Sequence, residues 1–137
     1  MAGYERMVYR GRQVRAHQVI LEVLVRMLVD EMDRLVDPPA WVPAHRAEWF
    51  AVATEEWGFW ALDDLDRELP DREGALLIAR LARDVVARLE AMGDPISAEQ
   101  LNAIGAGRPD GFFGGELPAE ALLVPARALV AVLEERD

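Results

Sequence analysis

The segment 13–36 has apolar residues at helical spacing over most of its length. Its charged residues Glu22, Arg26 and Asp30 recur every four positions, so on a helix they form one narrow stripe. Most of the circumference is therefore apolar, and such a helix needs either a central place in a bundle or a second subunit to cover it. The sequence thus predicts a helix over residues 13–36 that lies at the centre of the fold or in a homodimer contact.

Proline and glycine residues divide the next part of the chain. Pro38 and Pro39 end the first helix, because proline removes a backbone donor and disfavours helical dihedrals in the residue before it. A second helix is expected to begin at Pro43, since proline is favoured in a first helical turn. Gly58 costs only about 1 kcal/mol inside a helix. The sequence therefore leaves open whether residues 43–69 form one helix or two.

The second half of the chain carries signals for helix ends. Asp71 is a candidate N-cap for a helix that ends at Met92. Ser97 and Gln100 have the spacing of a capping box, which predicts the start of a short helix. A last helix is expected to begin at Pro118.

Together these patterns predict an all-α fold. Residues 1–137 are expected to form one compact domain, a bundle of four to five helices with the segment 13–36 at its centre. The five glycines within residues 105–117 indicate a Gly-rich loop before the last helix. Residues 1–12 carry three arginines and are a candidate extended basic arm.

Composition narrows the classes of function. A formal net charge of −10 disfavours a nucleic-acid-binding surface, which needs a basic field. The chain has no cysteine and no lysine, which excludes disulfides, thiolate metal ligands and a lysine Schiff base. Charged residues interrupt the apolar stretch 19–32, so no membrane span is expected. The absence of a secretory signal pattern predicts a cytoplasmic protein, and arginine without lysine is typical of a GC-rich bacterial genome.

The negative charge is concentrated in one part of the chain. Residues 30–69 contain three arginines and eleven acidic residues, a net charge of −8. Within them, residues 55–69 combine aromatic and acidic side chains, as a docking surface for a basic protein would. The two adjacent phenylalanines of the Gly-rich loop are a second candidate contact. The candidate partner-binding residues are Glu55, Glu56, Phe59, Asp63, Asp64, Asp66, Phe112 and Phe113.

Two functions compete on these observations. The leading hypothesis is an acidic helical binding or regulatory protein that docks a basic protein partner in an immunity, antitoxin-like or adaptor role. The alternative is a small helical enzyme or ligand-binding protein whose aromatic pocket lies between helices and is closed by the Phe112–Phe113 loop. A homodimer through the 13–36 helix is compatible with both. The pocket would be lined by Trp41, His45, Glu48, Trp49, Trp57 and Trp60.

One of the two histidines has a carboxylate at helical spacing. His45 lies three residues before Glu48, so both side chains share one helical face and could supply two metal ligands. Glu55 extends that face. A polar pair near a helix start is the commoner explanation, and the helical di-iron pattern needs repeated motifs that this sequence lacks. The sequence therefore predicts no metal, no cofactor and no catalytic residue.

Overall fold

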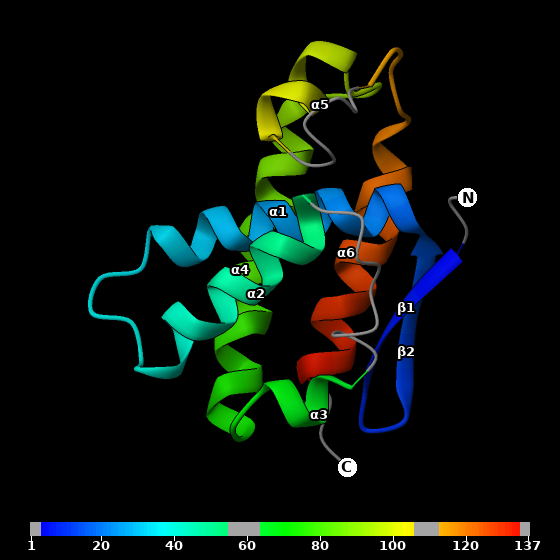
Figure 1. The fold of residues 1–137 in the computed structure, drawn as a ribbon. Coiled ribbons are helices and arrows are strands. Elements are labelled where there is room, and N and C mark those ends of the chain that lie inside the picture. The colour runs from blue at the N-terminus through cyan, green and yellow to red at the C-terminus, as the bar shows by residue number, and fades with distance from the viewer. Residues whose placement is uncertain (1–3, 55–63, 106–112, 135–137) are drawn as a thin grey trace.

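The computed structural model describes residues 4–54, 64–105 and 113–134. Within these residues a β-hairpin precedes a set of helices (Figure 1). The elements are β1 (Tyr4–Tyr9), β2 (Arg12–His17), α1 (Gln18–Asp33), α2 (Trp41–Thr54), α3 (Leu65–Glu68), α4 (Arg72–Met92), α5 (Ala98–Ile104) and α6 (Ala119–Glu134).

Helix α1 lies at the centre of the fold, as its nearly all-apolar surface predicts. Ten of its sixteen residues are buried. Figure 1 shows α1 running across the directions of α4 and α6, with α2 packed along it. The apolar surface of α1 is thus covered by the chain itself, and the homodimer through this segment stays a prediction.

The β-hairpin corrects two predictions, the all-α class and the helix over residues 13–36. Residues 12–17 pair with residues 4–9 in an antiparallel sheet of two strands, so the helix begins only at Gln18 and already ends at Asp33. Arg10 and Gly11 join the strands with φ of 52° and 77°. Two positive φ values in a two-residue loop match the twist of a hairpin, and glycine adopts them without steric cost.

The hairpin is amphipathic, with one face on the core and one outside. Met7, Tyr9 and Val14 are buried, whereas the residues that alternate with them on β1 and β2 are exposed or half-buried. This alternation is the strand period of two. The candidate extended arm, residues 1–12, thus includes a strand that packs on the body of the protein.

The predicted helix caps are confirmed. The Asp71 side chain accepts a hydrogen bond from the Gly74 N–H at 2.8 Å. Ser97 Oγ accepts from the Gln100 N–H at 3.1 Å, and Gln100 Oε1 accepts from the Ser97 N–H at 2.9 Å. These bonds satisfy N–H groups that have no partner within a helix, so they fix where α4 and α5 begin.

Helices α4 and α6 pack side by side and build most of the remaining core. One side of α4 is buried, at Ala75, Ile78, Ala82, Val85 and Leu89. Pro125 lies inside α6 and does not divide it. In the described residues no helix has the length and apolar character needed to cross a membrane.

The described ends of the predicted Gly-rich loop are attached to the body of the protein. Gly105 closes α5 in the left-handed conformation. The Phe113 N–H donates to Asn102 Oδ1 at 2.7 Å, and Asn102 Nδ2 donates to the Phe113 carbonyl. Leu117 exchanges two backbone hydrogen bonds with Ile96. The rest of this predicted loop, residues 106–112, lies outside the described residues.

Candidate functional site

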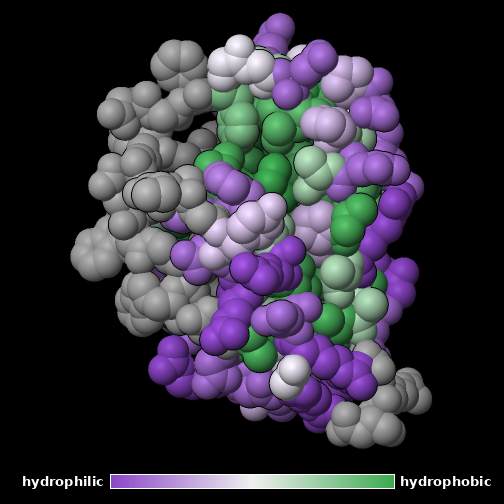
Figure 2. Space-filling model, turned by 90° about the vertical axis from the view of Figure 1, so that its right-hand side faces the viewer, coloured by the Kyte–Doolittle hydropathy of each residue, from purple (hydrophilic) through white to green (hydrophobic). Residues whose placement is uncertain are grey.

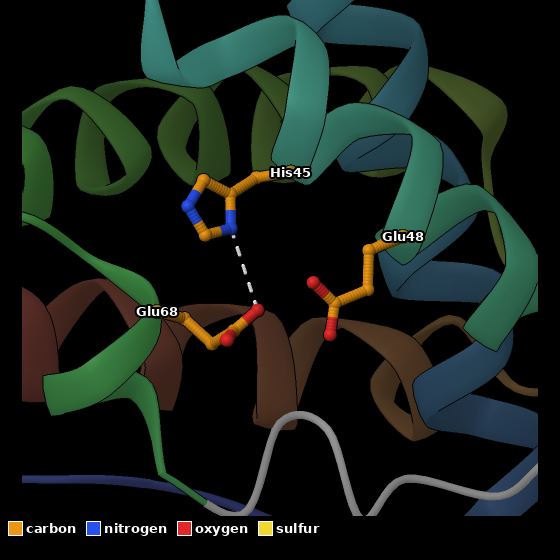
Figure 3. Close-up of side chains that lie close together, drawn as sticks. All are labelled: His45, Glu48 and Glu68. Carbon is orange, nitrogen blue, oxygen red and sulfur yellow. Dashed lines mark ion pairs between the residues drawn. The ribbon is translucent and has the colours of Figure 1, made fainter.

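Helices α2 and α3 bring one histidine and two glutamates together. His45 and Glu48 project from α2, and Glu68 projects toward them from α3 (Figure 3). One potential ligand atom of each residue lies within 4.8 Å of the other two. The sequence predicts the pair on α2, whereas Glu68 comes from a helix that sequence reasoning did not separate from the acidic stretch.

Trp41 limits how the His45 ring can turn. The two residues lie one helical turn apart at the start of α2, so their side chains share a face. The ring centroids are 5.6 Å apart with an interplanar angle of 69°, an edge-to-face contact. In this orientation His45 Nδ1 lies 3.4 Å from Glu68 Oε1.

Three contacts hold helix α3 in place. Asp64 Oδ1 accepts a hydrogen bond from the Arg67 N–H at 3.2 Å and caps the helix. Asp66 Oδ2 accepts from the Arg10 N–H of the hairpin turn at 2.8 Å. Leu65 is buried in the core on the same short helix. These contacts direct Glu68 inward, toward α2.

Two polar atoms of the cluster, one on Glu68 and one on His45, are buried without a hydrogen-bond partner. Glu68 is 6% exposed, and its Oε1 forms no hydrogen bond. His45 Nδ1 likewise has no hydrogen-bond partner, although it is close enough to Glu68 for an ion pair. Burial and the neighbouring Glu68 carboxylate raise the pKa of Glu48 above its usual value. A buried oxygen without a partner destabilises the folded state by about 1–3 kcal/mol, so this arrangement lowers the stability of the protein.

The same donor atoms fit a divalent cation. Two carboxylates and one neutral imidazole supply a charge of −2, and two of the ligand atoms, His45 Nδ1 and Glu68 Oε1, form no hydrogen bond. Ligand atoms about 2.0 Å from a tetrahedral zinc ion lie about 3.3 Å apart, close to the distance between His45 and Glu68. Three protein ligands leave a further coordination position for water or a small ligand.

Of the predicted aromatic pocket, the structure places two tryptophans. Trp41 contacts His45, whereas Trp49 is fully buried in the core with its Nε1 unpartnered. Phe113 lies beside α5, which Figure 1 shows at the opposite end of the molecule from α3. Trp57, Trp60 and Phe112 lie outside the described residues.

The predicted docking surface is described only in part. Asp64 and Asp66 accept hydrogen bonds from the chain itself. Asp30 and Glu31 on α1 pair with Arg88 of α4, so some of the negative charge of residues 30–69 is matched within the fold. Docking of a basic partner stays a prediction. Its other acidic-stretch residues, Glu55, Glu56, Phe59 and Asp63, lie outside the described residues.

Comparisons of the chain with protein-family models, with curated proteins and with solved structures found no match. A fold alone does not determine what a protein does. Any functional conclusion therefore depends on the chemistry of the residues that the fold brings together.

Proposed function

We propose that this protein binds a divalent transition-metal ion through His45, Glu48 and Glu68. The observation that carries the proposal is the Glu68 carboxylate, which is 6% exposed and has an oxygen without a hydrogen-bond partner. That oxygen faces His45 Nδ1, and Glu48 approaches from the same side (Figure 3). A cation at this point would satisfy all three groups at once. The proposal narrows the ligand-binding alternative to one class of ligand.

The donor set indicates which metals suit the site. Imidazole nitrogen favours zinc, iron, copper and nickel, whereas carboxylate oxygen also accommodates manganese. The chain has no cysteine, so soft thiolate ligands that select copper(I) or iron–sulfur clusters are excluded. Zn²⁺ is therefore a suitable probe, and Mn²⁺ is a second probe with a weaker demand for nitrogen ligands.

Titration calorimetry with Zn²⁺ on the full chain, purified free of metal, tests the proposal. We expect one Zn²⁺ per chain and a more than about 100-fold loss of affinity in Glu68→Gln. The threshold is high because loss of a residue that merely orients a ligand costs about 10–100-fold. Glu68→Gln keeps the shape of the side chain but removes the charge.

A matched control is the same substitution at an exposed carboxylate. Glu99 is exposed on α5, which Figure 1 places far from α3. Glu99→Gln should bind Zn²⁺ as tightly as the unchanged protein. The proposal is wrong if the unchanged protein binds no Zn²⁺, or if Glu68→Gln and Glu99→Gln bind it equally well.

A further inference from the structure

Helix α3 connects the candidate metal site to the β-hairpin. Glu68 projects from α3 toward α2 (Figure 3), whereas Asp66 Oδ2 accepts a hydrogen bond from the Arg10 N–H at 2.8 Å. Residues two apart on a helix are separated by about 200° around its axis, so these two side chains leave α3 on opposite sides. Figure 1 shows α3 beside the turn of the hairpin, and α3 contacts β1. The two sides of α3 thus face two different parts of the protein.

The position of α3 depends on a small number of contacts. The helix is a single turn of four residues, and so short a helix is not stable by itself in water. Leu65 and Leu69 anchor it in the core. Its hydrogen bond with the hairpin turn is exposed, and Figure 2 shows that hydrophilic residues cover much of the lower part of the hairpin side of the molecule. Exposed hydrogen bonds open more readily than buried ones, so this contact depends on how firmly α3 itself is held.

On the other side of α3, the charges of the cluster act against its contact with α2. One oxygen of Glu48 and one of Glu68 lie within 4.8 Å of each other, and like charges at this distance repel. Arg67 compensates Glu68 only in part, because its Nε is 4.0 Å away and its side chain is exposed. A divalent cation held by His45, Glu48 and Glu68 reverses the sign of this interaction. It attracts both carboxylates and so draws α3 toward α2.

We infer that metal binding at this cluster is coupled to the contact between α3 and the hairpin turn. A bound cation stabilises the hydrogen bond from the Arg10 N–H to Asp66, and that hydrogen bond in turn raises the affinity for the cation. The inference rests on the proposed metal site and adds a regulatory role to it, since the metal controls how firmly the hairpin turn is held. Coupling between two equilibria is reciprocal, so both effects must have the same size.

Hydrogen exchange at the Arg10 amide measures the first effect. NMR on the full chain follows it with saturating Zn²⁺ and with EDTA. We expect Zn²⁺ to slow this exchange at least about 5-fold, the lower end of common couplings between two sites. The Leu101 N–H is the control, because it donates to the Ser97 carbonyl in α5, at the opposite end of the molecule from α3 (Figure 1). Its exchange should not change.

Titration calorimetry with Zn²⁺ on Asp66→Ala measures the reciprocal effect. Loss of the acceptor should weaken Zn²⁺ binding by the same factor, at least about 5-fold. Asp66→Asn is the matched control, because it removes the negative charge but keeps an oxygen that can accept the hydrogen bond. Asp66→Asn should therefore lose less affinity than Asp66→Ala. Circular dichroism checks that both variants are folded.

The outcomes separate the coupling from the metal site itself. If the unchanged protein binds Zn²⁺ but its Arg10 amide exchanges equally fast with Zn²⁺ and with EDTA, the coupling is wrong and the metal site stands. Equal losses of affinity in Asp66→Ala and Asp66→Asn also contradict the coupling, since the charge of Asp66 would then matter and its hydrogen bond would not. If the unchanged protein binds no Zn²⁺, the proposed metal site is wrong, and the coupling falls with it.

Discussion

Gly74 lies at the start of α4, where there is no room for a larger side chain. A Cβ at this position would lie 2.9 Å from Pro70 Cδ and 3.4 Å from Trp41 Cζ2. The first distance is shorter than any ordinary contact, and the proline ring has little freedom to move away. Gly74 therefore allows α4 to approach the residues that precede it and the start of α2.

The substitution Gly74→Ala should destabilise the protein by about 1–3 kcal/mol, the usual cost of overpacking. Gly114→Ala is the control, because a Cβ there would meet no atom within 4 Å. Urea unfolding of both variants measures the difference. Equal free energies of unfolding would show that α4 does not pack as tightly against Pro70 as the structure indicates.

The three residues of the candidate metal site differ in how far the sequence could predict them. His45 and Glu48 follow from a spacing of three within one helix, which is a local property. Glu68 depends on how α3 is placed against α2, and no local pattern contains that information. A signal for α3 was nevertheless present, since Asp64 is a good N-cap residue in front of it.

The predictions for whole elements succeeded where a side chain fixes a helix end. Asp71 and Ser97 act within four residues of sequence, so α4 and α5 begin where their caps predict. The hairpin was missed because β2 leads directly into α1 with no proline or glycine between them. His17 makes this junction by accepting a hydrogen bond from the Val19 N–H, a cap that usual residue preferences do not predict.

Helices α1 and α2 are joined by a bidentate ion pair that depends on pH. Arg46 donates two hydrogen bonds to Asp33, at 3.0 and 3.1 Å. These bonds hold the pKa of the Asp33 carboxyl below its usual value. The pair therefore contributes its full stability above the ordinary aspartate pKa of about 3.9, and this contribution is lost as the pH falls through the lowered value.

Asp33→Asn should thus lower the free energy of unfolding at pH 7 but have little effect at pH 2. The loss should be below about 1 kcal/mol, because the pair is exposed to solvent. Urea unfolding at the two pH values measures it, with Asp84→Asn on α4 as a control at an exposed carboxylate. A loss for Asp33→Asn that is the same at both pH values would contradict this assignment.

At the scale of the whole molecule, the charges form a pattern that composition alone does not reveal. The basic hairpin turn contacts the acidic helix α3 through Arg10 and Asp66. Glu68, on that same helix, belongs to the candidate metal site. The basic hairpin and the acidic helix α3 therefore meet next to this site. Arg6 and Arg15, which pair across the two strands, are exposed on the outer face of the hairpin.

Two consequences follow for the predicted docking of a basic partner. Charge reversal at Asp64 or Asp66 would also disturb α3 and its contact with the hairpin, so a lost interaction would have two explanations. Metal binding at His45, Glu48 and Glu68 does not require such a partner, since all three ligands come from the chain itself.

The most direct measurement of this metal site is anomalous X-ray diffraction at the zinc absorption edge, from crystals of the full chain grown with Zn²⁺. We expect a strong peak about 2.0–2.2 Å from His45 Nδ1 and from an oxygen of each glutamate. Crystals of Glu68→Gln should lack the peak. Crystals in which these three groups hold only water or one another, with Zn²⁺ elsewhere or absent, would contradict the proposed site.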